Sequence, residues 1–314
     1  MSSQIKAKAY KAAHEAAVFV DRSNLGMLKF TGTTRLDLVN RMSTQAVNGL
    51  KSGEGAATIL TTDIGRIIDR LILYASSDTV YALTSENNAD NIARYLMRFV
   101  FFNDDFHIED LSAKTAVFAI YGPQARAKLV EAGFPDEDLP LHHWRQTEVA
   151  GVTTYLHRTD PVAGDGYFVM CETADKEAVY VHLLAVGIEE IDEAAFDFLR
   201  IESGLPRLGR EMTLEYIPLE ANLWDDVSFD KGCYTGQEII ARMESRGRLA
   251  KKLLKLQLAA PVEVGATLKS DDKTAGTITS AAAGPGGTVA LGYVKTNMLG
   301  EALRVGEMAV TVRN

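Results

Sequence analysis

The segment from Leu253 to Asn314 constrains the fold of this 314-residue chain most strongly. It divides into short runs with alternating apolar and polar residues, separated by turns that contain Gly, Pro or Asp: LLKLQL, ATLKS, TAGTITSAA, VALGYV, ALRV and MAVTVRN. Alternation with a period of two is typical of strands with one buried face. Six short antiparallel strands in so small a segment predict a compact β-barrel or closed sandwich over residues 253–314.

Residues 1–252 have a mixed pattern. Helical spacing of apolar residues occurs in Phe30–Asn48 and Asn88–Phe101, and we expect further helices after Pro123 and over Ala174–Ala185. Between them lie runs that favour strands: TILTT, RIIDRLILYA, TVYALTS, AVFAIYG, TTYLHRT and GYFVMCE. The chain is long enough for two or three domains, and its fold class is predicted to be α+β.

Composition and charge restrict the classes of function. The net charge of −9 argues against general nucleic-acid binding, which depends on neutralising phosphates. No apolar run approaches the length of a membrane span, so no membrane association is expected. The N-terminal segment is basic and helix-prone but has no secretory apolar region. These features predict a cytoplasmic protein.

The chain contains two cysteines, Cys171 and Cys233, too far apart in sequence for a metal-binding motif. An iron–sulfur cluster normally takes four protein ligands, so this protein would act on clusters indirectly or with ligands from a partner. The histidines form no zinc-binding pattern, and a disulfide is not expected in a reducing compartment. We therefore expect no stably bound metal.

The octapeptide KGCYTGQE, Lys231 to Glu238, places Cys233 just before a predicted helix. Thr235 and Glu238 have the spacing of a capping box, which predicts a helix from about Gly236 to Arg246. The positive end of this helix and the nearby Lys231 would favour the thiolate form of Cys233.

The same residues permit a second interpretation of the octapeptide. Tyr234 could offer a stacking face to a flat ligand, as expected of a binding site. In a purely structural turn, however, Cys233 would be a small buried apolar group, and Glu238 would pair with Arg242 at i,i+4. The local pattern leaves both interpretations open.

KGCYTGQE closely resembles the signature of the YgfZ family, folate-binding proteins linked to the maturation of iron–sulfur proteins. That family is related to the T-protein, the aminomethyltransferase of glycine cleavage. The segments Phe30–Leu50, Gly65–Tyr74 and Leu199–Trp224 also resemble the T-protein pattern, so the similarity covers nearly the whole chain. It implies two interleaved α+β lobes in residues 1–252, arranged around a central channel, followed by the barrel.

The resemblance also implies a bound tetrahydrofolate or one-carbon derivative. Its flat pterin needs polar anchors and an aromatic face, and its glutamate tail needs basic residues. The candidates that could contact the ligand are Arg200, Glu202, Glu220, Asn222, Trp224, Lys231, Tyr234, Gln237 and Arg242, with Arg246, Arg248, Lys251 and Lys252 also near the tail. As an alternative, Arg200 and Glu202 could form a structural ion pair, and the basic residues could complement a helix dipole.

Two departures from the T-protein pattern bear on activity. Alignment with that family places Asn91 where the enzyme has an aspartate, although the neighbouring Asp90 could supply the carboxylate if the register shifts by one residue. It also places Phe168 where the enzyme has a pterin-binding glutamate. Without both carboxylates, aminomethyl transfer loses its acid or base.

From the resemblance we expect a folate-binding factor that supports the assembly or repair of iron–sulfur proteins, with Cys233 as its functional thiol. Its partners would be iron–sulfur proteins or their assembly factors. One alternative is a tetrahydrofolate-dependent aminomethyltransferase or demethylase that uses Asp90. The other is a non-catalytic scaffold that keeps the fold without using folate.

Overall fold

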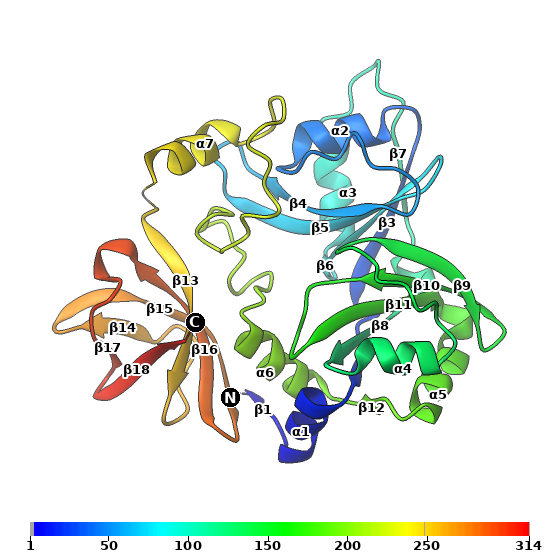
Figure 1. Cartoon of the computed structure of the whole chain (residues 1–314). Helices are drawn as coiled ribbons and strands as arrows, with labels where there is room; N and C mark the ends of the chain where they lie inside the picture. Colours follow the sequence, from blue (N-terminus) through cyan, green and yellow to red (C-terminus); the bar gives the residue numbers. More distant parts are fainter. Residues whose placement is uncertain (1–2, 248, 314) are drawn as a thin grey trace.

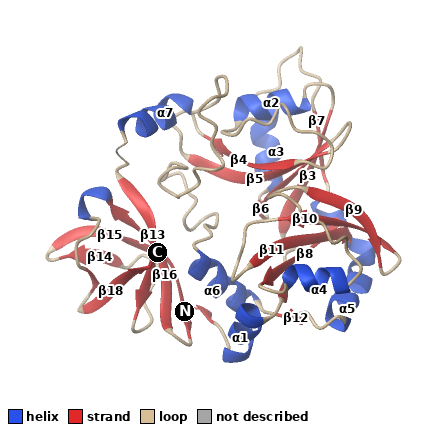
Figure 2. Cartoon of the chain, viewed as in Figure 1, coloured by secondary structure: helices blue, strands red, loops and turns tan. Residues whose placement is uncertain are grey.

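Three β-sheets lie around a shared core in the computed structural model, which describes residues 3–247 and 249–313 (Figure 1). The α-helices of the described chain are α1 Ala7–Glu15, α2 Arg35–Met42, α3 Ala89–Met97, α4 Ala125–Glu131, α5 Lys176–Ala185, α6 Glu193–Ser203 and α7 Gln237–Arg246. The connection between α6 and α7, residues 204–236, contains no named helix or strand and runs through the middle of the molecule (Figure 2).

The first sheet is antiparallel, with strand order β4-β5-β6-β3-β7. Its strands are β3 Leu25–Thr31, β4 Gly55–Thr61, β5 Ile67–Ala75, β6 Val80–Glu86 and β7 His107–Asp110. Because side chains alternate along a strand, Leu71 and Leu73 of β5 pack with residues of α2 and α3 on the outer face. Ile72 and Tyr74 enter the central core instead. Arg70 shares their inner face.

The second sheet has the order β12-β2-β8-β11-β10-β9, with only β12 and β2 parallel. Its strands are β2 Val18–Asp21, β8 Thr115–Gly122, β9 Trp144–Val149, β10 Val152–Arg158, β11 Asp165–Glu172 and β12 Glu189–Glu190. Phe118 and Cys171 pack with α4 and α5 on the outer face. Tyr121 and Phe168 face the central core. The two N-terminal sheets therefore turn their inner faces to one core.

The C-terminal strands form a closed antiparallel barrel in the order β15-β14-β17-β18-β13-β16, because β16 pairs back with β15. They are β13 Lys251–Leu258, β14 Thr267–Ser270, β15 Lys273–Gly284, β16 Gly287–Lys295, β17 Leu303–Val305 and β18 Met308–Arg313. Each corresponds to one of the six runs in the sequence. The predicted α+β class and C-terminal barrel are confirmed.

The N-terminus and α6 connect the barrel to the two sheets. Strand β1, Ser3–Gln4, pairs in parallel with β15, so these two residues extend the sheet of the C-terminal barrel. Helix α6 contacts β1, β15 and β16, and Phe198 of α6 lies in the same core as Tyr121 and Tyr293. Neither connection has a local sequence signal, because both depend on contacts between residues far apart in the chain.

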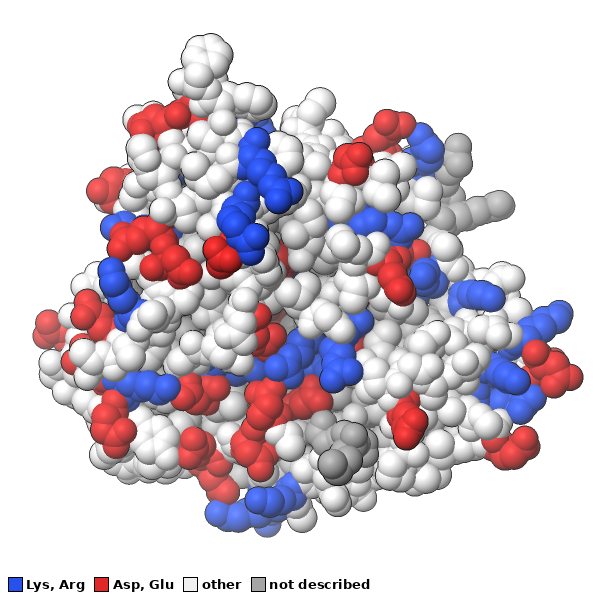
Figure 3. All heavy atoms as spheres, turned by 180° about the vertical axis from the view of Figure 1, so that it is seen from behind, with Lys and Arg blue, Asp and Glu red and all other residues white. Residues whose placement is uncertain are grey.

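Several global properties limit the kinds of site that the structure holds. Within the described chain, no helix has both the length and the apolar character needed to cross a bilayer. The same residues contain no group of three or more His, Cys, Asp or Glu side chains placed to hold a metal ion. On the face shown in Figure 3, acidic and basic side chains are interspersed.

Two buried histidines should make stability depend on pH. Burial lowers the pKa of His157 to about 3, and burial together with the charge of Arg70 lowers the pKa of His142 to about 4. Unfolded histidine titrates near about 6.5, so below that pH the unfolded chain binds protons that the folded chain excludes. Stability should therefore fall between about pH 6.5 and 4, by up to about 1.4 kcal/mol per pH unit for each histidine.

Urea denaturation across this pH range measures the effect. His157→Phe should remove the share of the slope that His157 contributes. If His157→Phe and the unmodified protein have the same slope, burial of His157 does not set this pH dependence.

Candidate binding site at the centre of the molecule

The inner faces of the first two sheets and the connection after α6 enclose a cavity of about 110 Å³. The rings of Tyr121, Phe168 and Phe196 line it, together with the charged side chains of Arg70 and Asp160. A neighbouring pocket of about 310 Å³ is also lined by Arg70 and Asp160. The two spaces therefore share this arginine–aspartate pair, between the sheets and the 204–236 connection.

Arg70 holds two carboxylates from distant parts of the chain. Its Nη1 and Nη2 donate to Asp160 at 2.7 and 3.2 Å, and its Nε and Nη2 donate to Asp226 at 2.6 and 3.3 Å. Burial opposes the charge of the guanidinium, but the charges of Asp160 and Asp226 outweigh burial and raise the pKa of Arg70. This cation is thus fixed in position and remains charged.

The cavity's carboxylates are poorly suited to proton transfer. Among its described lining residues, the carboxylates are Glu86 and Asp160. Burial raises the pKa of each, but Arg70 outweighs burial at Asp160, and Arg22 and Arg207 do so at Glu86, so both pKa values are lowered. A general acid or base works best with a pKa near the operating pH. The cavity therefore offers fixed charges and ring faces for binding.

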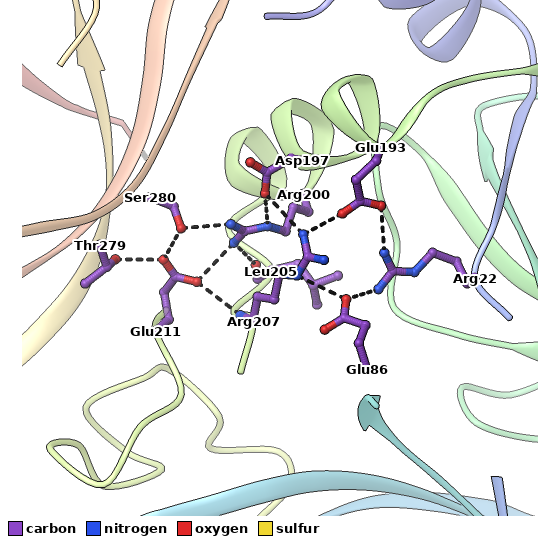
Figure 4. A network of polar contacts seen from close by, with 10 residues as sticks. All are labelled: Arg22, Glu86, Glu193, Asp197, Arg200, Leu205, Arg207, Glu211, Thr279 and Ser280. Carbon is purple, nitrogen blue, oxygen red and sulfur yellow. Dashed lines mark hydrogen bonds and ion pairs between the residues drawn. The ribbon is translucent and has the colours of Figure 1, made fainter. Parts of the chain in front are cut away.

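A ring of alternating charges borders the cavity beside α6 (Figure 4). Arg22 pairs with Glu86, and its Nη1 donates to Glu193 at 3.2 Å. Arg207 contacts the same two acids, at 3.0 Å from Nε to Glu86 and 2.6 Å from Nη1 to Glu193. This ring joins β2, the end of β6, the start of α6 and the following connection.

Arg200 lies beside that ring and is only 2% exposed. Its Nε donates to Asp197 at 2.7 Å, its Nη1 to Glu211 at 3.0 Å and its Nη2 to Ser280 at 2.8 Å (Figure 4). The fully buried Glu211 also accepts hydrogen bonds from Thr279 and Ser280 of the barrel. Arg200 thus has a structural ionic role, as the alternative proposed, but its partners are Asp197 and Glu211 and not Glu202.

The other predicted ligand contacts are dispersed. Glu202 pairs with His14 at 2.8 Å, and the buried Glu220 accepts from the Ile217 amide at 3.2 Å. Asn222 lines the 310 Å³ pocket and donates to the Leu253 carbonyl at 2.8 Å. Arg200 and Asn222 line the central spaces, but the following candidates do not: Glu202, Glu220, Trp224, Lys231, Tyr234, Gln237 and Arg242. Arg248 and the side chain of Arg246 lie outside the described residues.

Helix α7 begins where it was predicted to begin, but the prediction of a capping box is wrong. The N-cap is Gly236, with φ +85°, and no side chain caps the helix. The hydroxyl of Thr235 points to the sulfur of Met42, 3.7 Å away. A Cβ at Gly236 would lie 2.6 Å from the Thr62 carbonyl oxygen. Close packing on the β4–β5 turn therefore sets the helix start and requires glycine.

Lys231 anchors the octapeptide to the end of α2. Its Nζ donates to the carbonyl oxygens of Asn40, Ser43 and Gln45 at 2.6, 2.9 and 2.8 Å. Burial lowers the pKa of Lys231 to about 8. The three carbonyls use all three N–H groups of the ammonium, which leaves none for Cys233 or a ligand. The structure thus gives Lys231 the role of an anchor.

The remaining octapeptide side chains divide between core and surface. Tyr234 is buried in a small apolar cluster, so its ring offers no open stacking face. Cys233 is exposed, which contradicts the buried-turn alternative, whereas Cys171 is buried. The predicted pair of Arg242 with Glu238 is present on the surface at 2.6 Å. Trp224 is 39% exposed and lies 6.2 Å from the Phe229 ring.

Comparison with known proteins supplies the family. Residues 2–231 match the family model described as the GCVT N-terminal domain. The chain belongs to the GCVT N-terminal domain family. Residues 251–314 match the CAF17 C-terminal beta-barrel domain, so Cys233 and α7 lie between the two matched regions.

Individual relatives agree with this assignment. A chloroplastic putative transferase of Arabidopsis thaliana is 29% identical over 96% of this chain and 71% of the relative. An aminomethyltransferase of Halalkalibacterium halodurans is also 29% identical, over 79% of this chain and 70% of its own length. The glycine cleavage aminomethyltransferase T of Bartonella henselae has the same fold, with a TM-score of 0.86 at 23% identity over 98% and 88% of the two chains. The predicted resemblance is confirmed.

The two positions that depart from the T-protein pattern, Asn91 with its neighbour Asp90 and Phe168, lie in different parts of the fold. Asp90 is on α3, which packs on the outer face of the first sheet, and its exposed carboxylate pairs with Arg94 at 2.8 Å. Asn91 lies beside it and donates to Asn88 at 2.9 Å. This placement corrects the interpretation of Asp90 as a catalytic carboxylate, because the central cavity is on the opposite face. Phe168, in contrast, lines the cavity.

Sequence reasoning missed the main residues of the two central spaces, which are Arg70, Tyr121, Asp160, Phe196 and Asp226. One signal was available in the segment GRIIDRLILY, where two adjacent charges interrupt an apolar strand. Buried charges require partners, so such an interruption marks a place where distant acids or bases must meet.

Proposed function

We propose that this protein binds a reduced folate in the central cavity and supports the assembly or repair of iron–sulfur proteins through Cys233, without catalysing aminomethyl transfer. The observation that carries the proposal is the cavity itself. Its aromatic rings adjoin a fixed Arg70–Asp160 pair, and its carboxylates are bound to arginines. Such a site favours recognition of a flat polar molecule over proton transfer.

The lining residues fit the chemical features of a folate. Tyr121, Phe168 and Phe196 would adjoin the flat ring system, and the Arg70–Asp160 pair would supply polar contacts at its edge. The adjoining 310 Å³ pocket gives space for the rest of the molecule. When bound, a reduced folate can carry one-carbon units. The protein's own groups would hold and orient it and exclude water.

The transferase alternative lacks a suitable carboxylate. Asp90 lies on the outer face of the first sheet, and Phe168 cannot accept a proton. The neighbouring Asp69 is fully buried on that outer face, where it accepts from Ser85 at 2.5 Å and Asn88 at 2.9 Å. The available geometry therefore supports binding better than turnover.

The exposed thiol supports the iron–sulfur part of the proposal. Lys231 holds the octapeptide against α2, and Cys233 remains accessible next to that anchor. One exposed thiol cannot complete a conventional cluster site, so a client or assembly factor would provide the other ligands. Cys233 would thus act at the contact with the partner protein.

A folate titration tests the binding site directly. Tetrahydrofolate should raise the melting temperature by a few degrees, because a ligand at about 100 times its Kd stabilises the folded state by about 2.7 kcal/mol. Leu208→Trp, which adds a bulky ring to a half-buried lining position, should abolish this shift. Calorimetry should show the same loss of binding, and no methylenetetrahydrofolate should form with an aminomethylated lipoyl protein.

Leu214→Trp is the matched control, since Leu214 lies in the same connection but is 64% exposed and outside the cavity. It should bind as the unmodified protein does. If millimolar tetrahydrofolate binds to none of these proteins, the scaffold alternative is favoured. Rapid formation of methylenetetrahydrofolate would instead establish the transferase.

A further inference from the structure

A second, larger cavity lies between the two N-terminal sheets, next to the central site. Its volume is about 460 Å³, within the range of small-molecule pockets, and it shares no lining residue with the two central spaces. Strands β5 and β6 contribute Tyr74 and Tyr81, and β9 and β10 contribute Trp144, Tyr155 and His157. These five aromatic side chains are one third of the residues that line the pocket.

The aromatic walls are held in fixed orientations. Trp144 donates from Nε1 to the Ala75 carbonyl at 3.0 Å. Its ring stacks on His157 with centroids 6.0 Å apart and an angle of 18° between the planes. Tyr74 packs edge-on against His157 at 4.1 Å, and Tyr155 lies 5.9 Å from Trp144. Such walls select flat ligands, because little rearrangement is needed to admit them.

The lining residues His157 and Tyr74 carry three buried polar atoms that have no protein partner within the described chain. They are both ring nitrogens of His157 and the hydroxyl of Tyr74. These residues are 4% and 1% exposed, so bulk water does not readily satisfy them. An unsatisfied buried polar group costs about 1–3 kcal/mol, and native structures keep such groups rarely and for a reason. A neutral histidine can both donate and accept a hydrogen bond.

We propose that this pocket binds a flat heteroaromatic molecule of one or two rings, whose polar atoms pair with His157 and Tyr74. The aromatic walls would contact the faces of the ligand, and the inner histidine and tyrosine would recognise its ring heteroatoms. Exposed residues at the opening, among them Ala113 and Lys114, leave a route from solvent. This site is independent of the proposed folate site.

Fluorine NMR of protein labelled with 5-fluorotryptophan tests the site, because the chain has two tryptophans and one of them forms a pocket wall. Trp224→Phe assigns the two signals. Isoquinoline should shift the Trp144 signal and leave the Trp224 signal in place. It should bind about tenfold more tightly than naphthalene, which has the same shape but no ring nitrogen, because one hydrogen bond is lost.

Variants distinguish hydrogen bonding of the ligand to His157 and Tyr74 from non-specific occupation of the pocket. His157→Phe and Tyr74→Phe each keep an aromatic ring, so they should reduce the preference for isoquinoline over naphthalene. Ala113→Trp, at an exposed lining position, should block both probes, whereas Ala302→Trp on an exposed barrel loop should block neither.

The proposal is overturned if millimolar isoquinoline leaves the Trp144 signal unchanged, or if both probes bind equally well to every variant. Competition by tetrahydrofolate would also overturn it, because the two ligands would then share one site. If the unmodified protein binds isoquinoline but does not bind tetrahydrofolate, only the proposed function is contradicted.

Discussion

Replacing Arg200 with methionine should destabilise the protein by about 3–5 kcal/mol, because it leaves the fully buried Glu211 without its cationic partner. The guanidinium also joins α6 to Ser280 of the barrel, so its loss should loosen the contact between barrel and core. Urea denaturation at neutral pH measures the change in the free energy of unfolding.

Two variants make this measurement specific. Arg242→Met breaks an ion pair on the surface and should cost no more than about 1 kcal/mol. Arg200→Met combined with Glu211→Gln removes both buried charges and should recover part of the lost stability. If Arg200→Met costs no more than Arg242→Met, the buried pair contributes little to holding the lobes together.

Replacing Cys233 with alanine should abolish the proposed support of iron–sulfur enzymes while leaving the fold intact. The thiol is exposed, so its removal opens no cavity in the core. Complementation of a cell that lacks the native protein, read as the activity of its iron–sulfur enzymes, measures function. The melting temperature of purified Cys233→Ala checks folding separately.

Alkylation provides the chemical half of this test. Burial raises the pKa of Cys171 to about 11, about two units above an ordinary thiol, which lowers its thiolate fraction by roughly 100-fold. Iodoacetamide should therefore modify the exposed Cys233 much faster than the buried Cys171 at pH 7.5. Cys171→Ala is the matched control and should retain complementation. A folded Cys233→Ala protein with full complementation would leave the octapeptide a structural role only.

The octapeptide contains residues that hold it in place and, between them, an exposed residue that is free to react. Lys231 and Gly236 attach it to α2 and to the β4–β5 turn, through three carbonyl contacts and one close backbone approach. Cys233 lies between these two anchors and is exposed to solvent. The anchors would hold the thiol in a defined place for a partner protein.

Local sequence patterns were sufficient to predict most of the secondary structure. The six alternating runs after Lys252 became the strands of the barrel, and the apolar spacing in Asn88–Phe101 marked α3. Helix α7 also lies where the octapeptide predicts it, although its cap differs. These features depend on residues within a few positions of one another, so their periodicity is visible in the chain itself.

The sequence by itself therefore determined the family, the α+β class, the barrel and the presence of α7. Only the tertiary structure decided which charges meet. Arg70 pairs with acids 90 and 156 positions away, and Lys231 contacts a carbonyl 191 positions away. The sequence around an ionic side chain does not indicate which distant residue will pair with it. A buried charge nevertheless requires such a partner. For the same reason Asp90, a plausible catalytic acid in the sequence, lies on the outer face of a sheet whose inner face holds the cavity.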